Sequence, residues 1–361
     1  MKKIIHCSLY KTLFVVCGLG VLATAQTVNA KPIIIKFDAP HAKVGPSQGT
    51  VPVGLNGLGD AVGFYTGKTH AGGFIRAADG TFETFRLKKD IDTVPLGIND
   101  AGTTTGNYFE ADGFSHGFVR DAAGIFTTFD PTDSGGEFGT QPIVINDQGT
   151  VAGFFGDANN GIHGFTRAAD GSLTTIDVEG AGSSDTEGTY VQNMSAKDVT
   201  TGYYLGDDFI AHAFIRKPTG KTVTFDVPGS TSTLSEGINV HGVVCGAYTD
   251  QNGANHGFVR EPDGSISTVD VTGAGTGAGE GTTAYVINDK GAVGGYFVDG
   301  NSTYHGFVRS PAGKVTIIDV EGAGSGALQG TFLQAMNNDG TVLGLYVDKD
   351  NGRHGFLRVA R

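Results

Sequence analysis

One short pattern recurs seven times along this chain. A Gly-Phe or Ala-Phe pair is followed by Ile, Val, Thr or Leu and then by Arg, and successive copies are 44 to 49 residues apart. The phenylalanines of the copies are Phe74, Phe118, Phe165, Phe214, Phe258, Phe307 and Phe356. A fixed period of this length is typical of a repeat architecture, in which each unit buries its apolar face against its neighbours.

Each repeat contains four short segments in which apolar and polar residues alternate. In the sixth repeat they are 282–288, 293–298, 305–309 and 315–320, separated by turn sequences such as Asn288-Asp289-Lys290-Gly291. Alternation with period two indicates β-strands, and no sustained helical period occurs after residue 30. Four antiparallel strands per repeat predict an all-β fold, a seven-bladed β-propeller. A β-solenoid and tandem sandwiches are the alternatives.

The two ends of the chain favour the propeller. The last repeat stops at RHGFLRVAR without a fourth strand, whereas residues 33–56, near the start, match residues 316–337, which contain such a strand. We therefore expect the N-terminal strand to complete the last blade and close the ring, leaving no long free sheet edge.

Residues 1–30 are predicted to be a signal peptide. A basic start is followed by an apolar run, Leu13 to Leu22, and by small residues that permit cleavage after Ala25 or Ala30. The run is short for a membrane anchor, which is the alternative. Residues 31–361 would then form a single propeller domain, secreted to the extracellular space or the periplasm.

The charge of the predicted mature chain limits its partners. Residues 1–30 contain three Lys and no acid, which leaves 22 basic and 37 acidic residues and a formal charge of −15. This balance disfavours nucleic acid or an anionic membrane and permits cations or basic ligands. Cys245 alone remains, so no internal disulfide is expected. The partner is otherwise unknown; an extracellular ligand, a glycan or a protein fits this class.

The repeats also resemble the HAF-type repeats of bacterial extracellular proteins. The literal triplet occurs once, as His212-Ala213-Phe214, and the other copies with a histidine have His-Gly-Phe. The resemblance implies secretion and a repeat fold, and it implies no particular reaction.

A histidine and an aspartate, fourteen positions apart, recur within the repeats. A three-residue hairpin loop between the third and fourth strands places the two side chains opposite each other. The expected pairs are His116–Asp130, His163–Asp177, His212–Asp226, His256–Asp270, His305–Asp319 and, across the ring closure, His354–Asp38. In the first repeat, Gly72 and Arg86 stand at the two positions. A catalytic dyad is the alternative, but six copies spread around a ring favour a structural role.

Calcium is the one cofactor that the sequence suggests, through short Asp- and Asn-rich loops. These loops lack the downstream Glu of an EF-hand, and Asp and Asn also form ordinary turns, so the working expectation is no cofactor. The candidate ligands are Asp157, Asp250, Asp299, Asp348 and Asp350.

Function is expected on the face where the variable loops gather, because recognition is usually built on loops held by a rigid scaffold. Acids on this face are Asp112, Asp157, Asp207, Asp208, Asp250, Asp299, Asp348, Asp350, Glu137, Asp185, Glu187 and Glu280. Innermost-strand residues that differ between repeats are Tyr190, Gln192, Glu236, Tyr285 and Gln334. They are candidates to line the channel mouth and bind a ligand, and packing between the blades is the alternative. The sequence favours a non-catalytic binding scaffold acting through the acidic loop face. The alternative is a propeller hydrolase or lyase with carboxylates or a metal at the mouth.

Overall fold

The computed structural model describes residues 32–359 apart from 44, 111–112, 137 and 184–185. This part of the chain forms 28 β-strands and no α-helix, so the all-β prediction is confirmed. Consequently, none of its elements is a helix long and apolar enough to cross a membrane. The predicted signal peptide, residues 1–30, lies outside the described residues. The extent of the propeller domain, residues 31–361, stays a prediction.

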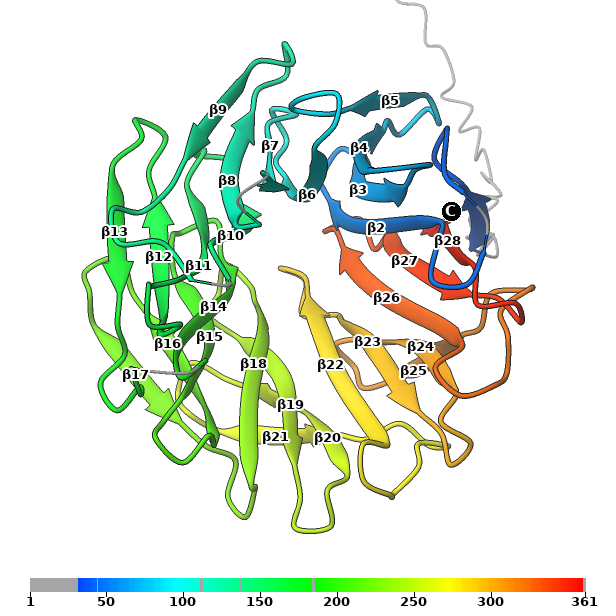
Figure 1. Ribbon diagram of the computed structural model, residues 1–361. Helices are drawn as coiled ribbons and strands as arrows, with labels where there is room; N and C mark the ends of the chain where they lie inside the picture. The colour runs from blue at the N-terminus through cyan, green and yellow to red at the C-terminus, as the bar shows by residue number, and fades with distance from the viewer. Residues whose placement is uncertain (1–31, 44, 111–112, 137, 184–185, 360–361) are drawn as a thin grey trace, which may run out of the picture.

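Antiparallel pairing groups the strands into sets of four, numbered here along the chain (Figure 1). The first set contains β2 (Thr50–Leu55), β3 (Ala61–Thr66), β4 (Ala71–Arg76) and β5 (Phe82–Phe85). The second contains β6 (Asp92–Ile98), β7 (Thr104–Phe109), β8 (Ser115–Arg120) and β9 (Phe126–Phe129). The third contains β10 (Thr140–Ile145), β11 (Val151–Gly156), β12 (Ile162–Arg167) and β13 (Leu173–Ile176). The fourth set contains β14 (Gly188–Met194), β15 (Thr200–Leu205), β16 (Ala211–Arg216) and β17 (Thr222–Phe225). The fifth contains β18 (Ser232–Ile238), β19 (Val244–Thr249), β20 (Asn255–Arg260) and β21 (Ile266–Val269). The sixth contains β22 (Gly281–Ile287), β23 (Val293–Val298), β24 (Tyr304–Arg309) and β25 (Val315–Ile318). The grouping is consistent with about seven blades.

The last set joins the two ends of the chain. It contains β26 (Gly330–Met336), β27 (Val342–Val347), β28 (Arg353–Val359) and, as its outer strand, β1 (Ile33–Phe37). β1 runs antiparallel to β28, with Ile33 opposite Val359 and Phe37 opposite Gly355. The N-terminal strand therefore completes the last set, as the match between the chain ends predicts.

The core lies between neighbouring sets, which are arranged around a central opening (Figure 1). The seven repeated phenylalanines are fully buried. Phe356, for example, packs with Ile318 and Val320 of the preceding set. The first and last sets also meet, since Ala61 of β3 packs with Leu343 and Leu357. Burying a side chain of this size contributes about 2–3 kcal/mol, so inter-set packing is a major source of stability.

A threonine at the start of each inner strand fixes the crossover from the preceding set. Thr331 is fully buried, and its hydroxyl accepts a 3.0 Å hydrogen bond from the Val320 amide, just after β25. Thr282 accepts a matching bond from Val271. The glycine before Thr282, Gly281, has φ +111°, and a Cβ there would collide with the Asn255 carbonyl oxygen. The recurrent Gly-Thr pair thus allows close backbone approach between neighbouring sets.

Candidate functional site

A β-bulge occurs in the innermost strand of every set. In β22, for example, Ala284 pairs with Gly295 and Val286 with Gly294, which leaves Tyr285 as the extra residue. A bulge breaks the side-chain alternation of a strand and redirects one residue. The extra residues are Val53, Leu96, Ile143, Gln192, Glu236, Tyr285 and Gln334.

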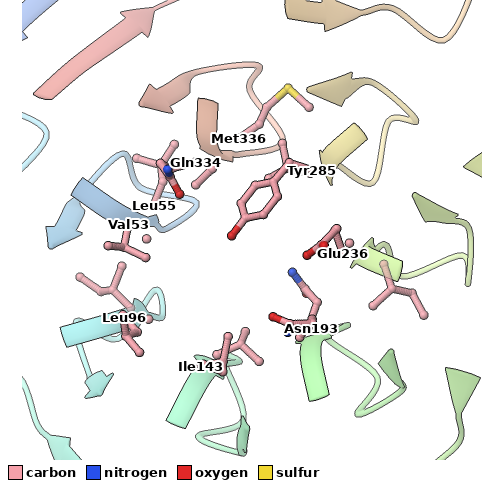
Figure 2. Close-up of a pocket in the computed structure, with 18 of the residues that line it drawn as sticks. Val53, Leu55, Leu96, Ile143, Asn193, Glu236, Tyr285, Gln334 and Met336 are labelled. Atoms are coloured by element: carbon pink, nitrogen blue, oxygen red, sulfur yellow. The ribbon is translucent and has the colours of Figure 1, made fainter. Parts of the chain in front are cut away.

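All seven bulge residues line one central cavity of about 270 Å³, and we call them the channel ring. Figure 2 shows this cavity with the side chains of Val53, Leu96 and Ile143 on one side and those of Glu236 and Tyr285 on the other, while Gln334 lies beside Leu55. The first three sets thus supply an apolar arc. The later sets supply a polar arc, which Gln192 and its neighbour Asn193 complete. An amphipathic cavity of this kind suits a ligand with a polar end and an apolar body.

Glu236 is the single ionisable carboxyl group of the channel ring. Burial raises its pKa to about 7, because the walls of the cavity shield the carboxylate from bulk water. No hydrogen bond or ion pair to its side chain is found among the described residues. Burial, and then the charge of Glu236, also raises the pKa of the Tyr285 hydroxyl. At neutral pH the ring therefore holds a carboxyl group poised between its two protonation states.

The structure corrects the prediction for one of the five channel residues. Gln192, Glu236, Tyr285 and Gln334 line the cavity, but Tyr190 does not. Its hydroxyl donates a 2.6 Å hydrogen bond to the Thr186 carbonyl, and its ring stacks on Tyr203 at 4.9 Å. Tyr190 is two residues before the bulge, so it stays buried in the packing of the sheet.

The sequence prediction missed the apolar arc of Val53, Leu96 and Ile143. A positional signal for these residues was present. Every ring residue stands three positions before the buried polar residue that directly follows its inner strand: Asn56, Asn99, Asn146, Ser195, Asn239, Asn288 or Asn337.

These terminal asparagines form a belt around one mouth of the channel. The Asn288 side-chain amide donates to the Asn337 carbonyl at 3.1 Å, and Asn337 donates to the Asn56 carbonyl of the first set at 3.3 Å. A second cavity, of about 250 Å³, is lined by this belt and shares Leu55, Ile98 and Met336 with the first. The ring is thus reached from the belt end. The variable loops lie at the opposite end, where the inner strands begin, which corrects the expected placement of the ring beside them.

The expected histidine–aspartate contacts are present on the outer strands. Nδ1 of His305 lies 2.9 Å from Asp319 Oδ1, and the other five distances lie between 2.7 and 3.0 Å: His116–Asp130, His163–Asp177, His212–Asp226, His256–Asp270 and His354–Asp38. The hairpin register matches the expectation, with Gly306 opposite Ile318 and Arg309 opposite Val315. None of these residues lines the two channel cavities.

Each of these histidines has further partners that the sequence did not reveal. His354 Nε2 lies 3.3 Å from Asp348 Oδ2, and its ring stacks on Tyr346 at 4.9 Å. His305 is placed in the same way between Asp299 and Phe297. We call this arrangement of an aromatic ring, a histidine and its carboxylates the histidine clamp. It joins the second, third and fourth strands of a set near the loop face.

The calcium candidates have other partners in the structure. Asp348 Oδ1 accepts hydrogen bonds from the Asp350 and Gly352 amides, at 2.9 and 2.7 Å. Asp157, Asp250 and Asp299 accept the equivalent amides of their own loops. Asp350 is exposed and lies 2.7 Å from Lys349. In the described part of the chain, no group of three or more His, Cys, Asp or Glu side chains is placed to hold a metal ion.

Comparisons with solved structures define the class of fold. The β-propeller domain of the trilobed protease from Pyrococcus furiosus matches with a TM-score of 0.58 at 9% identity, covering 89% of this chain and 96% of that chain. Puromycin hydrolase matches with a TM-score of 0.50 at 14% identity, covering 84% of this chain and 53% of that chain. No family model and no curated protein sequence matches. At these identities the matches show the fold alone, and this fold is a β-propeller.

Proposed function

We propose that the chain is a secreted, non-catalytic binding propeller of seven blades, and that its ligand binds at the channel ring. One observation carries the proposal. The bulge position is occupied by Val, Leu, Ile, Gln, Glu, Tyr and Gln in turn, whereas the Phe and Thr positions of the sets are uniform. Uniform positions support the scaffold, and the positions that share a cavity carry the chemical variety that recognition requires.

The ring supports recognition of a small ligand with two different sides. Its apolar arc offers Val53, Leu96 and Ile143, while Glu236 and Tyr285 offer hydrogen-bonding groups across the cavity (Figure 2). Gln334 adds an amide beside Leu55. A cavity of about 270 Å³ is below the usual size for drug-like ligands. A compound of monosaccharide or amino-acid size fits this description.

The acidic loop face is the second candidate binding surface. Asp207, Asp208 and Asp350 are exposed there, which favours a cation, a basic ligand, a glycan or a surface protein. Asp112, Glu137 and Asp185 of the predicted set lie outside the described residues, and Glu187 is buried. Secretion and kinship with HAF-type repeats belong to the same proposal, and they rest on the signal-like N-terminus and the His-Gly-Phe repeats.

An extracellular hydrolase or lyase is the alternative, and Glu236 is the observation that favours it. A carboxyl group with a pKa of about 7 can donate or accept a proton at neutral pH. It is, however, the one carboxyl group in the ring, and glycoside hydrolysis commonly uses two.

A thermal-shift screen of monosaccharides, amino acids and small amines, run with a hydrolase panel, tests the proposal. We expect a compound that raises the melting temperature of the wild type and of an Asp350→Asn control, but not of Val53→Trp or Glu236→Gln. Turnover that Glu236→Gln abolishes would replace binding by catalysis. Stabilisation that the ring variants leave unchanged, while Asp350→Asn reduces it, would move the site to the loop face.

A further inference from the structure

The first set departs from the histidine clamp at every position that carries charge. In the third, fifth, sixth and seventh sets, the residue after the second strand is Asp157, Asp250, Asp299 or Asp348, and in the first set it is Gly67. Gly72 replaces the histidine, and Arg86 replaces the aspartate that follows the fourth strand. The Thr93 hydroxyl accepts a hydrogen bond from the Leu87 amide, just after Arg86, as the equivalent threonine does in five other crossovers, so Arg86 occupies the equivalent backbone position.

Tyr65 and Arg86 occupy the space of the missing clamp. A Cβ on Gly72 would lie 2.5 Å from the Tyr65 hydroxyl oxygen, so the tyrosine leans over the glycine. The Arg86 guanidinium lies 6.0 Å from the centre of the Tyr65 ring and donates a 2.8 Å hydrogen bond to the His70 carbonyl. The guanidinium is therefore held in place by the backbone and an aromatic face, without a carboxylate partner among the described residues.

An open hollow of about 530 Å³ lies beside Arg86. Lys68 and His41 contribute further basic groups, Tyr65 and Phe85 contribute aromatic rings, and no carboxylate is among the described residues that line it. Lys68 is exposed and has no ion-pair partner in the described chain. On a chain of strongly negative net charge, the basic groups of this hollow offer an anion a local attraction.

His41 shows a further departure from the repeat. It adopts φ 71°, whereas the corresponding residues of four other crossovers, Gly180, Gly229, Gly273 and Gly322, are glycines with positive φ. Histidine pays a steric cost in this conformation that glycine does not. The imidazole that replaces glycine lies 6.4 Å from the Tyr65 ring, at the edge of the hollow.

We propose that this hollow is a binding site for a small organic carboxylate. The carboxylate would accept hydrogen bonds from the free donors of Arg86 and the ammonium group of Lys68, while the body of the ligand lies against Tyr65 and Phe85. Guanidinium and carboxylate groups form paired, charge-assisted hydrogen bonds, and the aromatic walls favour an organic anion over a bare inorganic one. This site is separate from the channel ring and does not depend on the function proposed for it.

Ligand-observed NMR titration of the folded full chain tests the proposal. The probes are benzoate and glucuronate, which distinguish a flat ring from a sugar body, with inorganic phosphate and neutral glucose for comparison. We expect benzoate or glucuronate to bind at millimolar concentration and glucose not to bind. Binding should fall by about ten-fold in Lys68→Gln and Arg86→Gln, since each removes a charge-assisted contact.

The control is Lys221→Gln, which removes the same charge from an exposed lysine outside the hollow. It should leave the affinity unchanged. Because the Lys68 side chain is exposed, Lys68→Gln should leave the fold intact, so a loss of binding in this variant cannot be due to misfolding. A melting curve of each variant checks that it is folded. No binding of either carboxylate, binding of phosphate alone, or an equal loss in Lys221→Gln would overturn the proposal.

Discussion

His354 Nδ1 lies 3.0 Å from Asp38 Oδ1, although 316 positions separate the two residues in the chain. The contact repeats the geometry of the five pairs in which fourteen positions separate the partners. It forms because β1 continues the sheet of β28 in the register that places Phe37 opposite Gly355. The two chain ends thus build the same clamp that a single hairpin builds elsewhere.

Removing the carboxylate of this pair should cost as much as removing one from an internal clamp. Asp38 and Asp319 are half-exposed, with side-chain exposures of 47% and 56%. We expect Asp38→Ala and Asp319→Ala each to lower the free energy of unfolding by about 1 kcal/mol, because solvent weakens each contact. Urea unfolding measures both. A cost for Asp319→Ala with none for Asp38→Ala would show that the end-to-end pair contributes nothing.

Glu236 should make stability depend on pH. Its pKa is about 7 in the folded chain and about 4.3 when unfolded, so folding favours the protonated form. Ionisation of the buried Glu236 carboxyl group therefore lowers the free energy of unfolding. This penalty is absent below the unfolded pKa, grows as the pH rises, and is complete above the folded pKa.

Glu236→Gln removes this penalty. The free energy of unfolding of the variant, minus that of the wild type, should be about 2–3 kcal/mol larger at pH ~8 than at pH ~4. Urea unfolding of both proteins at the two pH values measures the gain. An equal difference between the proteins at both pH values would contradict the raised pKa.

The crossover threonines offer a test of inter-set coupling. Thr331→Val keeps the shape of the side chain but leaves the buried Val320 amide without its acceptor. We expect a loss of about 1–3 kcal/mol, the usual cost of an unsatisfied buried donor. Thr331→Ser retains the hydroxyl and serves as the matched control in thermal unfolding. Equal melting temperatures for the valine and serine variants would rule out the hydrogen bond as the stabilising contact.

Calcium should not stabilise the loops between the second and third strands. The carboxylates of Asp299 and Asp348 already accept hydrogen bonds from backbone amides. They also lie beside the Nε2 atoms of His305 and His354. We expect the melting temperature to be the same with calcium and with EDTA. A rise with calcium that Asp299→Asn abolishes would restore these loops as ion sites.

The repeat made much of the fold predictable. Alternation gave the strands, and the hairpin count gave the facing of His305 and Asp319, because a three-residue loop allows one register. The bulges were not predictable in this way. The extra residue of a bulge, such as Tyr285, is not of any one amino-acid type. The direction in which its side chain points depends on how its strand pairs with the neighbouring strand. The contact of Asp348 with His354 Nε2 likewise depends on the fold of a five-residue loop.

Disulfide trapping tests the joining of the chain ends most directly. Ile34 and Arg358 are opposite each other in the β1–β28 ladder, so Ile34→Cys/Arg358→Cys should oxidise to a monomer with an internal cross-link that migrates differently on a denaturing gel. Ile34→Cys/Val223→Cys is the control, because Val223 lies on β17 of another set. Cross-linking in the first variant and not in the second is the predicted result. Only intermolecular dimers, or equal behaviour of the two variants, would contradict the joining of the chain ends on which the channel ring depends.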